Sequence, residues 1–239
     1  MSDEEHRIRY KEVPHSEDTD DAGVNRFERR VDNMFSKNAD RIKGRKVLDL
    51  ACNTGRLSYP MLMLGAASVT GVEARRELID RGEKIFADTP YAGQMTFEQG
   101  DLFDFLANAK PEEYDVIVCA GFLYHTVRHT DFFREIKRLA PETVIIDTNV
   151  AKNYLWFGRQ FFGKPPALFM YYEDPSKTSD TIDPDGVVYW PSTSYLEAML
   201  GGAGYECERV NFKTDGRANW AAMDDYKKGT RAAYVGRRR

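Results

Sequence analysis

The sequence predicts an α/β domain in which a doubly wound, mostly parallel sheet is covered by helices on both faces. Short apolar runs alternate with amphipathic helical segments between residues 46 and 147, and such alternation is typical of parallel strands joined by right-handed crossovers. The strand predicted at residues 114–119 has a continuous apolar run, as expected for a strand covered on both faces. An acidic residue stands near the end of three strands, at Asp49, Glu73 and Asp101.

The chain has 239 residues, enough for one sizeable core. We expect one domain over residues 23–239, preceded by a charged segment over residues 1–22 that is either a flexible tail or a lid. The net charge of -4 provides no global basic field that would attract nucleic acid.

The three cysteines, Cys52, Cys119 and Cys207, are an odd number and predict buried thiols in a reducing compartment. No apolar run approaches the roughly 18 residues that a membrane span needs. The acidic, polar N-terminus has no signal-peptide pattern. We therefore expect a cytoplasmic protein.

Apolar residues recur at helical spacing from residue 24 to residue 42 and predict an amphipathic helix that packs on the first strand. Gly44 marks its end. Arg26, Arg29 and Arg30 lie on this helix. We expect them to face solvent, with the alternative that one reaches a cofactor's carboxylate.

The strand at residues 46–50 runs into a turn of small residues and then a helix at residues 56–64. A dinucleotide site needs several glycines there, so that backbone can approach a pyrophosphate. This turn has one glycine, Gly55, and the carboxylate of Asp49 stands at its mouth. Asp49 would repel a pyrophosphate and attract a ligand that carries an ammonium and a sulfonium, as S-adenosyl-L-methionine does.

The next two strands also end in acids. Glu73 follows residues 68–72 and is placed to accept bonds from both ribose hydroxyls. Asp101 follows the strand that begins at residue 95, where an acid can accept a bond from the adenine amino group. Three acids at three successive strand ends predict S-adenosyl-L-methionine as the cofactor, with the alternative that these acids merely cap helices.

The remaining elements follow the same alternation. Helices are predicted at residues 75–86, 101–109, 131–139 and 192–200, the last with Ser192 as its N-cap, and strands at residues 143–147, 205–212 and 232–236.

These strands and acids resemble the class I (Rossmann-like) S-adenosylmethionine-dependent methyltransferases, most closely over residues 40–150. The resemblance implies a seven-stranded sheet that ends in an antiparallel hairpin. The family places glycines where Ala51 and Asn53 stand, but both residues are small, and Asn tolerates left-handed backbone. The cofactor site that the resemblance implies consists of Asp49, Ala51, Asn53, Gly55, Glu73, Ala74, Asp101, Leu102, Cys119, Ala120 and Gly121.

Residues 149–191 interrupt the alternation after the fifth strand with a long insertion that is dense in aromatic residues. A structureless loop of that length is unusual unless it is functional. In the resembling family this segment commonly builds the acceptor pocket, and we predict that role here. A surface subdomain or a homodimer contact is the alternative.

The transferred methyl group would lie at the carboxyl ends of the first and fourth strands, where the strand order reverses. Tyr124 and His125 follow the fourth strand and are the predicted catalytic residues. His125 is the candidate general base, because histidine titrates near neutral pH; the alternative is that it holds the loop. Tyr124 would donate to the acceptor or line the pocket, and His129 is a weaker candidate base.

No metal site is predicted. Metal-dependent relatives place an adjacent Asp-Asn pair after the fifth strand, whereas Thr148 separates Asp147 from Asn149 here. We predict methyl transfer to an oxygen or nitrogen of a small-molecule acceptor. Residues 121–125 and 189–192 also resemble the transfer-RNA wobble-uridine-modifying branch, which is one alternative. A non-catalytic methyltransferase-like partner subunit is the other.

Overall fold

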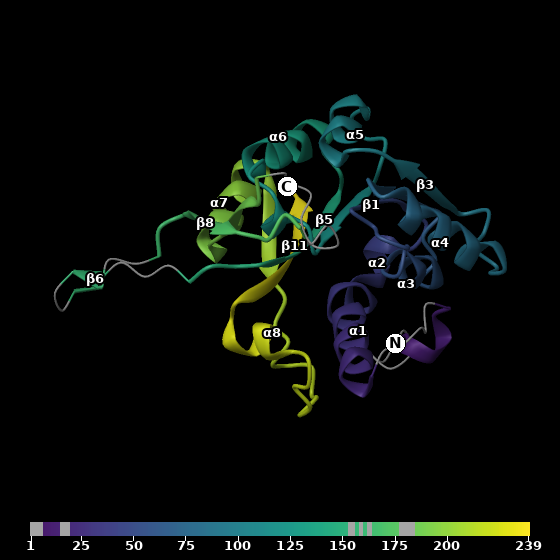
Figure 1. Cartoon of the computed structure of the whole chain (residues 1–239), viewed down its shortest axis with the longest axis horizontal. Helices are drawn as coiled ribbons and strands as arrows, with labels where there is room; N and C mark the ends of the chain where they lie inside the picture. The colour runs from purple at the N-terminus through teal and green to yellow at the C-terminus, as the bar shows by residue number, and fades with distance from the viewer. Residues whose placement is uncertain (1–6, 15–19, 153–155, 158–159, 162–163, 177–184) are drawn as a thin grey trace.

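The structure is a computed structural model that describes residues 7–14, 20–152, 156–157, 160–161, 164–176 and 185–239. Its main sheet has seven strands in the order β10-β11-β5-β4-β1-β2-β3 (Figure 1). The pairings from β5 through β4, β1 and β2 to β3 are parallel, and β11 is antiparallel to both β5 and β10. The predicted fold class is confirmed. The strands are β1 (Lys46–Leu50), β2 (Ser68–Glu73), β3 (Met95–Gln99), β4 (Val116–Ala120), β5 (Thr143–Asn149), β10 (Tyr205–Arg209) and β11 (Arg231–Arg238).

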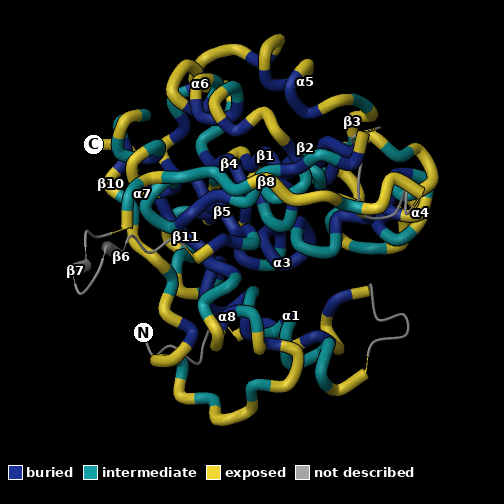
Figure 2. Tube along the Cα trace, turned by 60° about the vertical axis from the view of Figure 1, so that its left-hand side comes forward, coloured by how far each residue is buried: buried dark blue, intermediate teal, exposed yellow. Residues whose placement is uncertain are grey.

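Helices cover both faces of this sheet, and the side chains of each strand alternate between them. Val47 of β1 packs with the first cluster and Leu48 with the second, as the two-residue period of a strand requires. In Figure 2 the central strands form the buried layer of the molecule. The first face packs against α1 (Asp21–Met34), α2 (Ala39–Ile42), α3 (Ser58–Met63), α4 (Arg76–Ala87) and α8 (Asp224–Lys228), and the second against α5 (Leu102–Asn108), α6 (His129–Leu139) and α7 (Thr193–Gly202).

The helix predicted over residues 24–42 is in fact broken. Helix α1 begins at Asp21, because the Asp20 side chain accepts from the backbone N–H of Gly23 at 2.9 Å and caps it. The chain then passes through the 3-10 helix η2 (Ser36–Asn38) into α2. Asn38 donates its side-chain amide to the Met34 carbonyl at 3.0 Å, an alternative to regular helix that short polar side chains offer.

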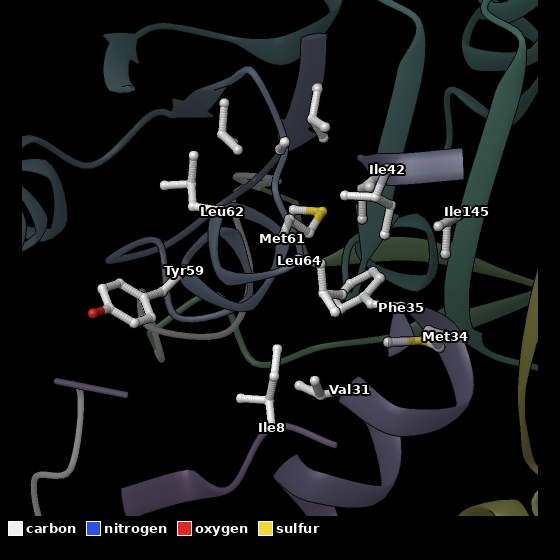
Figure 3. Close-up of a cluster of buried hydrophobic side chains, with 14 of the residues drawn as sticks. Ile8, Val31, Met34, Phe35, Ile42, Tyr59, Met61, Leu62, Leu64 and Ile145 are labelled. Atoms are coloured by element: carbon white, nitrogen blue, oxygen red, sulfur yellow. The ribbon is translucent and has the colours of Figure 1, made fainter. Parts of the chain in front are cut away.

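The segment before α1 packs into the first-face cluster. Ile8, Tyr10 and Val13 are buried, and the 3-10 helix η1 (Tyr10–Glu12) places the Tyr10 ring 5.2 Å from the Phe27 ring. Figure 3 shows Ile8 among the side chains of this cluster. Three side chains of residues 7–14 are therefore part of the core. That residues 1–22 form either a flexible tail or a lid stays a prediction, and residues 1–6 and 15–19 lie outside the described residues.

The insertion after β5 forms two small antiparallel pairs. Strand β6 (Trp156–Phe157) pairs with β7 (Gln160–Phe161), and β8 (Leu168–Tyr172) pairs with β9 (Val187–Pro191). A bridge between Ala151 and Ser192 joins the two ends of the insertion, with the Ala151 N–H donating to the Pro191 carbonyl at 3.0 Å. Within the described part of the chain, no helix has the length and apolar content to cross a membrane.

Candidate active site

The turn after β1 has a backbone conformation that favours glycine at alternate positions. Ala51, Asn53 and Gly55 have φ values of 55°, 56° and 77°. At Gly55 a Cβ atom would lie 2.8 Å from the Phe86 ring, so glycine is needed there for close packing as well. Ala51 and Asn53 take up the left-handed conformation, which costs an L-residue about 1–2 kcal/mol. The turn thus has the positive φ angles that favour glycine at three positions, although only one of them is a glycine.

Asp49 lies at the end of β1 and is 2% exposed. The Ser58 hydroxyl donates to its Oδ2 at 2.6 Å. Burial disfavours the carboxylate and raises the pKa of Asp49 to about 7, against the opposing effects of Ser58 and Arg30. An acid held near its titration point in this way binds a cation by losing its proton.

Glu73 ends β2 and is buried as well. It accepts from the Asn53 N–H at 3.0 Å and from Arg75 Nε at 2.8 Å. The carboxylate therefore holds the turn in place and has a guanidinium as partner. Ribose hydroxyls that bind Glu73 must share it with Arg75.

Asp101 is the N-cap of α5. Its Oδ1 accepts from the N–H groups of Phe103 at 2.8 Å and Asp104 at 3.2 Å. Arg128 lies 3.8 Å away in a half-exposed ion pair. The alternative prediction, that these acids cap helices, is therefore correct for one of the two carboxylate oxygens of Asp101.

Helix α1 contributes arginines to the interior, and the prediction that they face solvent is wrong for Arg29 and Arg30. Arg29 is 0% exposed and donates through Nε to Asp215 at 2.7 Å, and Arg30 Nη2 lies 2.6 Å from Asp147. Their acidic partners are 186 and 117 residues away along the chain, so the helical pattern alone did not reveal them. Buried cations need such partners.

Asp147, at the end of β5, is the centre of a buried charge network. Arg231 donates through Nε at 2.9 Å, Arg30 through Nε at 2.8 Å and Tyr226 through its hydroxyl at 2.8 Å. Burial opposes ionisation, but Arg231 and Arg30 outweigh it and hold the pKa of Asp147 well below its usual range. Sequence reasoning missed Arg231; the available signal was an arginine directly before the apolar run at residues 232–235.

A cavity of about 560 Å³ lies between α1 and the start of α3, and Arg26, Arg30 and Arg56 line it together with Asp20. Arg56 Nε is buried and has no hydrogen-bond partner among the described residues. Burial lowers the pKa of Arg56. An unpartnered guanidinium atom beside the turn fits the carboxylate of an amino-acid ligand. Asp49 fits its ammonium group, so these residues suit S-adenosyl-L-methionine.

The other predicted cofactor residues lie along the same edge of the sheet. Leu102 and Cys119 are buried, Ala74 is exposed, and Ala120 stands beside Asp147 in the register of β4 and β5. Gly121 has a φ of 108° and donates to the Asp147 carbonyl at 2.7 Å. Cys119 is 0% exposed, and burial raises the pKa of its thiol.

Tyr124 and His125 lie in the 3-10 helix η3 (Leu123–His125) after β4. The β8–β9 pair lies beside them: the Tyr124 ring is 6.2 Å from the Trp190 ring, and Trp190 stacks on Tyr171 at 4.5 Å. His125 Nδ1 lies 2.8 Å from Glu173, which follows β8. The structure thus brings both predicted catalytic residues against the aromatic insertion.

His129 is not available as a base. It is 0% exposed, and its Nε2 lies 2.9 Å from the Tyr189 carbonyl. Burial lowers its pKa. His129 therefore fixes β9 against the start of α6 and does not face an acceptor.

The strand order, the antiparallel final pair and the acids at the carboxyl ends of the parallel strands define a class I S-adenosylmethionine-dependent methyltransferase. A methyltransferase-domain family model matches residues 42–154. Ubiquinone biosynthesis O-methyltransferase of Proteus mirabilis (strain HI4320) is 31% identical over 172 residues, which cover 71% of this chain and 69% of that protein. The chain belongs to this family of S-adenosylmethionine-dependent methyltransferases.

Solved structures share the fold. The N-terminal domain of EvdMO1 with S-adenosylhomocysteine bound has a TM-score of 0.62 at 18% identity, covering 93% of this chain and 82% of that one. The glycopeptide N-methyltransferase MtfA complexed with S-adenosylmethionine has a TM-score of 0.53 at 15% identity, covering 81% and 87%. Because the chain belongs to the S-adenosylmethionine-dependent methyltransferases, its cofactor is S-adenosyl-L-methionine.

Proposed function

We propose that this methyltransferase transfers its methyl group to an oxygen or nitrogen of a small-molecule acceptor with ring character. The observation that carries the proposal is the placement of Tyr171 and Trp190 against Tyr124 and His125 at the carboxyl edge of the sheet. Stacked and edge-to-face rings of this kind bind planar, apolar groups. The named activities of the relatives, ubiquinone-pathway O-methylation and glycopeptide N-methylation, support an oxygen or nitrogen acceptor.

Each part of the cofactor has a partner in the proposed site. Asp49 takes the ammonium group, and Arg30 and Arg56 take the carboxylate. Glu73 takes the ribose hydroxyls and Asp101 the adenine amino group. The turn residues Ala51, Asn53 and Gly55 and the strand-end residues Ala74, Leu102, Cys119, Ala120 and Gly121 enclose it. When bound, the cofactor supplies an electrophilic methyl group on a sulfonium centre.

The residues of the chain supply alignment and proton removal. The aromatic side chains orient the acceptor, and orientation of this kind accounts for much of the rate of a displacement reaction. His125 Nε2 accepts the acceptor's proton. Tyr124 is held by its neighbours: Arg231, fixed on Asp147, lies with its guanidinium carbon 5.4 Å from the Tyr124 ring centre.

Trp190 provides a hydrogen-bond donor for the acceptor. Its Nε1 is buried and has no hydrogen-bond partner among the described residues, although a buried indole N–H usually has one. An acceptor with a carbonyl or hydroxyl oxygen beside its ring satisfies this atom. The described part of the insertion over residues 149–191 is thus the acceptor side of the domain, whose core also includes Ile8, Tyr10 and Val13.

Calorimetric titration with S-adenosylhomocysteine, with NAD as the control ligand, tests the cofactor site. We expect micromolar binding of the former alone. Mass-spectrometric screening of phenols, amines and other ring compounds for a gain of one methyl group then tests the acceptor class. Methylation of compounds without a ring, together with no methylation of compounds that have one, would contradict the proposal. Failure to bind either ligand would favour the non-catalytic partner subunit.

A second candidate, methylation of transfer RNA, is favoured by one groove. A depression of about 470 Å³ is lined by Arg209, Lys213, Lys227, Lys228 and Arg231, and no acidic side chain is among the described residues that line it. Arg231 connects the groove to the Tyr124 ring. Salt-dependent binding of unmodified transfer RNA that is lost in a Lys213→Ala/Lys227→Ala variant, but not in Lys84→Ala, would favour this function over a small-molecule acceptor.

A further inference from the structure

Glu173 is 48 residues from His125 along the chain, yet both of its carboxylate oxygens lie 2.8 Å from His125 Nδ1. The two side chains are only 19% and 17% exposed. Because a carboxylate accepts hydrogen bonds and does not donate them, Nδ1 carries the proton in this pair. In the neutral ring Nε2 is then the atom with a free lone pair, and no described residue bonds to it.

The backbone around Glu173 is built to keep its carboxylate in this place. The Glu173 N–H donates to the Gly186 carbonyl at 2.8 Å. Gly186 has a φ of +66°, and a Cβ atom there would lie 2.2 Å from the Glu173 carbonyl oxygen. Strand β9 is attached to the His125 segment by the Tyr189 N–H, which donates to the Thr126 carbonyl at 3.2 Å.

We propose that Glu173 is a positioning residue for methyl transfer, which holds His125 in the tautomer with an unprotonated Nε2. This inference rests on the proposed function, in which His125 is the base. The acceptor's proton moves to Nε2, the electron pair of the broken bond stays on the acceptor's oxygen or nitrogen, and Nδ1 keeps its proton. Glu173 balances the positive charge of the imidazolium that forms. The proton leaves Nε2 for solvent after transfer.

The described charged and titratable side chains on the neighbouring elements do not pair with His125. Asp147 on β5 is paired with Arg231 on β11. His129 on α6 is buried and has a lowered pKa, so it adds no positive charge. Tyr189 on β9 contacts the His125 segment through its backbone. Among the described residues, Glu173 is the carboxylate that contacts His125.

Two variants separate positioning of the base from simple attachment of the hairpin. Glu173→Gln keeps an oxygen that accepts from Nδ1 but removes the negative charge, whereas Glu173→Ala removes both. Glu206→Gln, at an exposed position on β10, is the matched control. The first measurement is nitrogen NMR of histidine-labelled protein about two pH units above the ordinary histidine value of roughly 6.5. We expect an Nδ1-protonated His125 in the native protein and in Glu173→Gln, and loss of that preference in Glu173→Ala.

The second measurement is the rate at which diethylpyrocarbonate modifies His125 Nε2, followed by mass spectrometry. We expect Glu173→Gln to react several-fold more slowly than the native protein and Glu206→Gln at the native rate. If Glu173 only attached the β8–β9 hairpin to His125, the modification rate would not change in Glu173→Gln, because that variant keeps the hydrogen bond. An unchanged rate, or an Nε2-protonated His125 in the native protein, overturns the proposal.

If Glu173→Ala does not fold, Gly186→Ala replaces it, because the added methyl group displaces Glu173 while the carboxylate remains. Calorimetry with S-adenosylhomocysteine on the native protein distinguishes a failure of the role proposed for Glu173 from a failure of the proposed function. Cofactor binding together with the wrong tautomer contradicts the role of Glu173 alone. The expected tautomer without cofactor binding contradicts the proposed function instead.

Discussion

Arg30 Nη2 of helix α1 lies 2.6 Å from Asp147 near the end of β5, so this helix is joined to the edge of the sheet where the proposed site lies. Arg231 contacts the same carboxylate from β11, the strand that pairs antiparallel with β5. One buried acid therefore balances two cations from the two ends of the chain. The consequence is that the shape of the site and the stability of the domain depend on the same side chain.

Replacement of Asp147 by Ala should destabilise the protein strongly. The change leaves two largely buried guanidinium groups without their carboxylate, and removing one partner of a buried ion pair costs about 3–5 kcal/mol. Urea unfolding measures this loss. Asp131→Ala, which removes the exposed partner of Arg128 and Arg134, should cost less than about 1 kcal/mol. Equal losses in both variants would contradict the buried network.

Ala51→Gly should stabilise the protein. Ala51 has a φ of 55°, which costs an L-residue about 1–2 kcal/mol, whereas the extra chain entropy of glycine costs about 0.5–1 kcal/mol. The difference predicts a gain of roughly 0.5–1 kcal/mol in the free energy of unfolding. Ala107→Gly, within helix α5, should instead lose about 1 kcal/mol. A loss at both positions would show that Ala51 is not strained.

Asp49 should make the protein less stable as the pH rises. Its pKa is raised from 3.8 to about 7 by burial, so between these values the folded state binds more protons than the unfolded state. Stability that is present below pH 4 is then lost by about 1.4 kcal/mol per pH unit up to pH 7. The difference between the native protein and Asp49→Asn in urea unfolding isolates this slope. A constant difference across that range would contradict the shift.

Cofactor affinity should show the opposite trend. The ammonium group of S-adenosylhomocysteine pairs with Asp49 only when the carboxylate is ionised, so the affinity should fall about tenfold one pH unit below the titration point of Asp49. Calorimetry across pH 6–8 measures this dependence. Asp49→Ala should abolish binding. A variant that binds normally would remove Asp49 from the proposed site.

His125→Ala should leave the affinity for S-adenosylhomocysteine largely intact and lower turnover on a suitable acceptor by about 10²–10⁴-fold, the usual contribution of a general base. Steady-state kinetics with the first acceptor found, together with calorimetry, check both parts. His125→Gln, which keeps a polar side chain, is the companion variant. Full turnover in either variant would show that another group removes the proton.

Features that depend on neighbouring residues were predictable from the sequence. The strands, the small turn and the acids at the strand ends each depend on a short stretch of sequence. The buried partners were not predictable. Arg30 and Asp147 are 117 residues apart, and His125 and Glu173 are 48 apart, so the fold alone brings them together.

The helix break at Asn38 shows the limit at short range. The apolar spacing continues through this position, but the Asn38 side chain bonds the Met34 carbonyl, and the local hydrogen bond overrides the periodic pattern. Asp101 shows a similar ambiguity, because one carboxylate can cap a helix and remain available to a ligand. Sequence patterns identify such a residue but do not separate its two uses.

The bridge between Ala151 and Ser192 brings the chain back to the point at which it left the sheet. A segment that departs and returns at one place can be lengthened, shortened or exchanged at a small entropic cost. The strands that carry Asp49 and Glu73 need not adjust. In the proposed function, replacing this one segment changes the acceptor of the enzyme while its methyl donor stays the same.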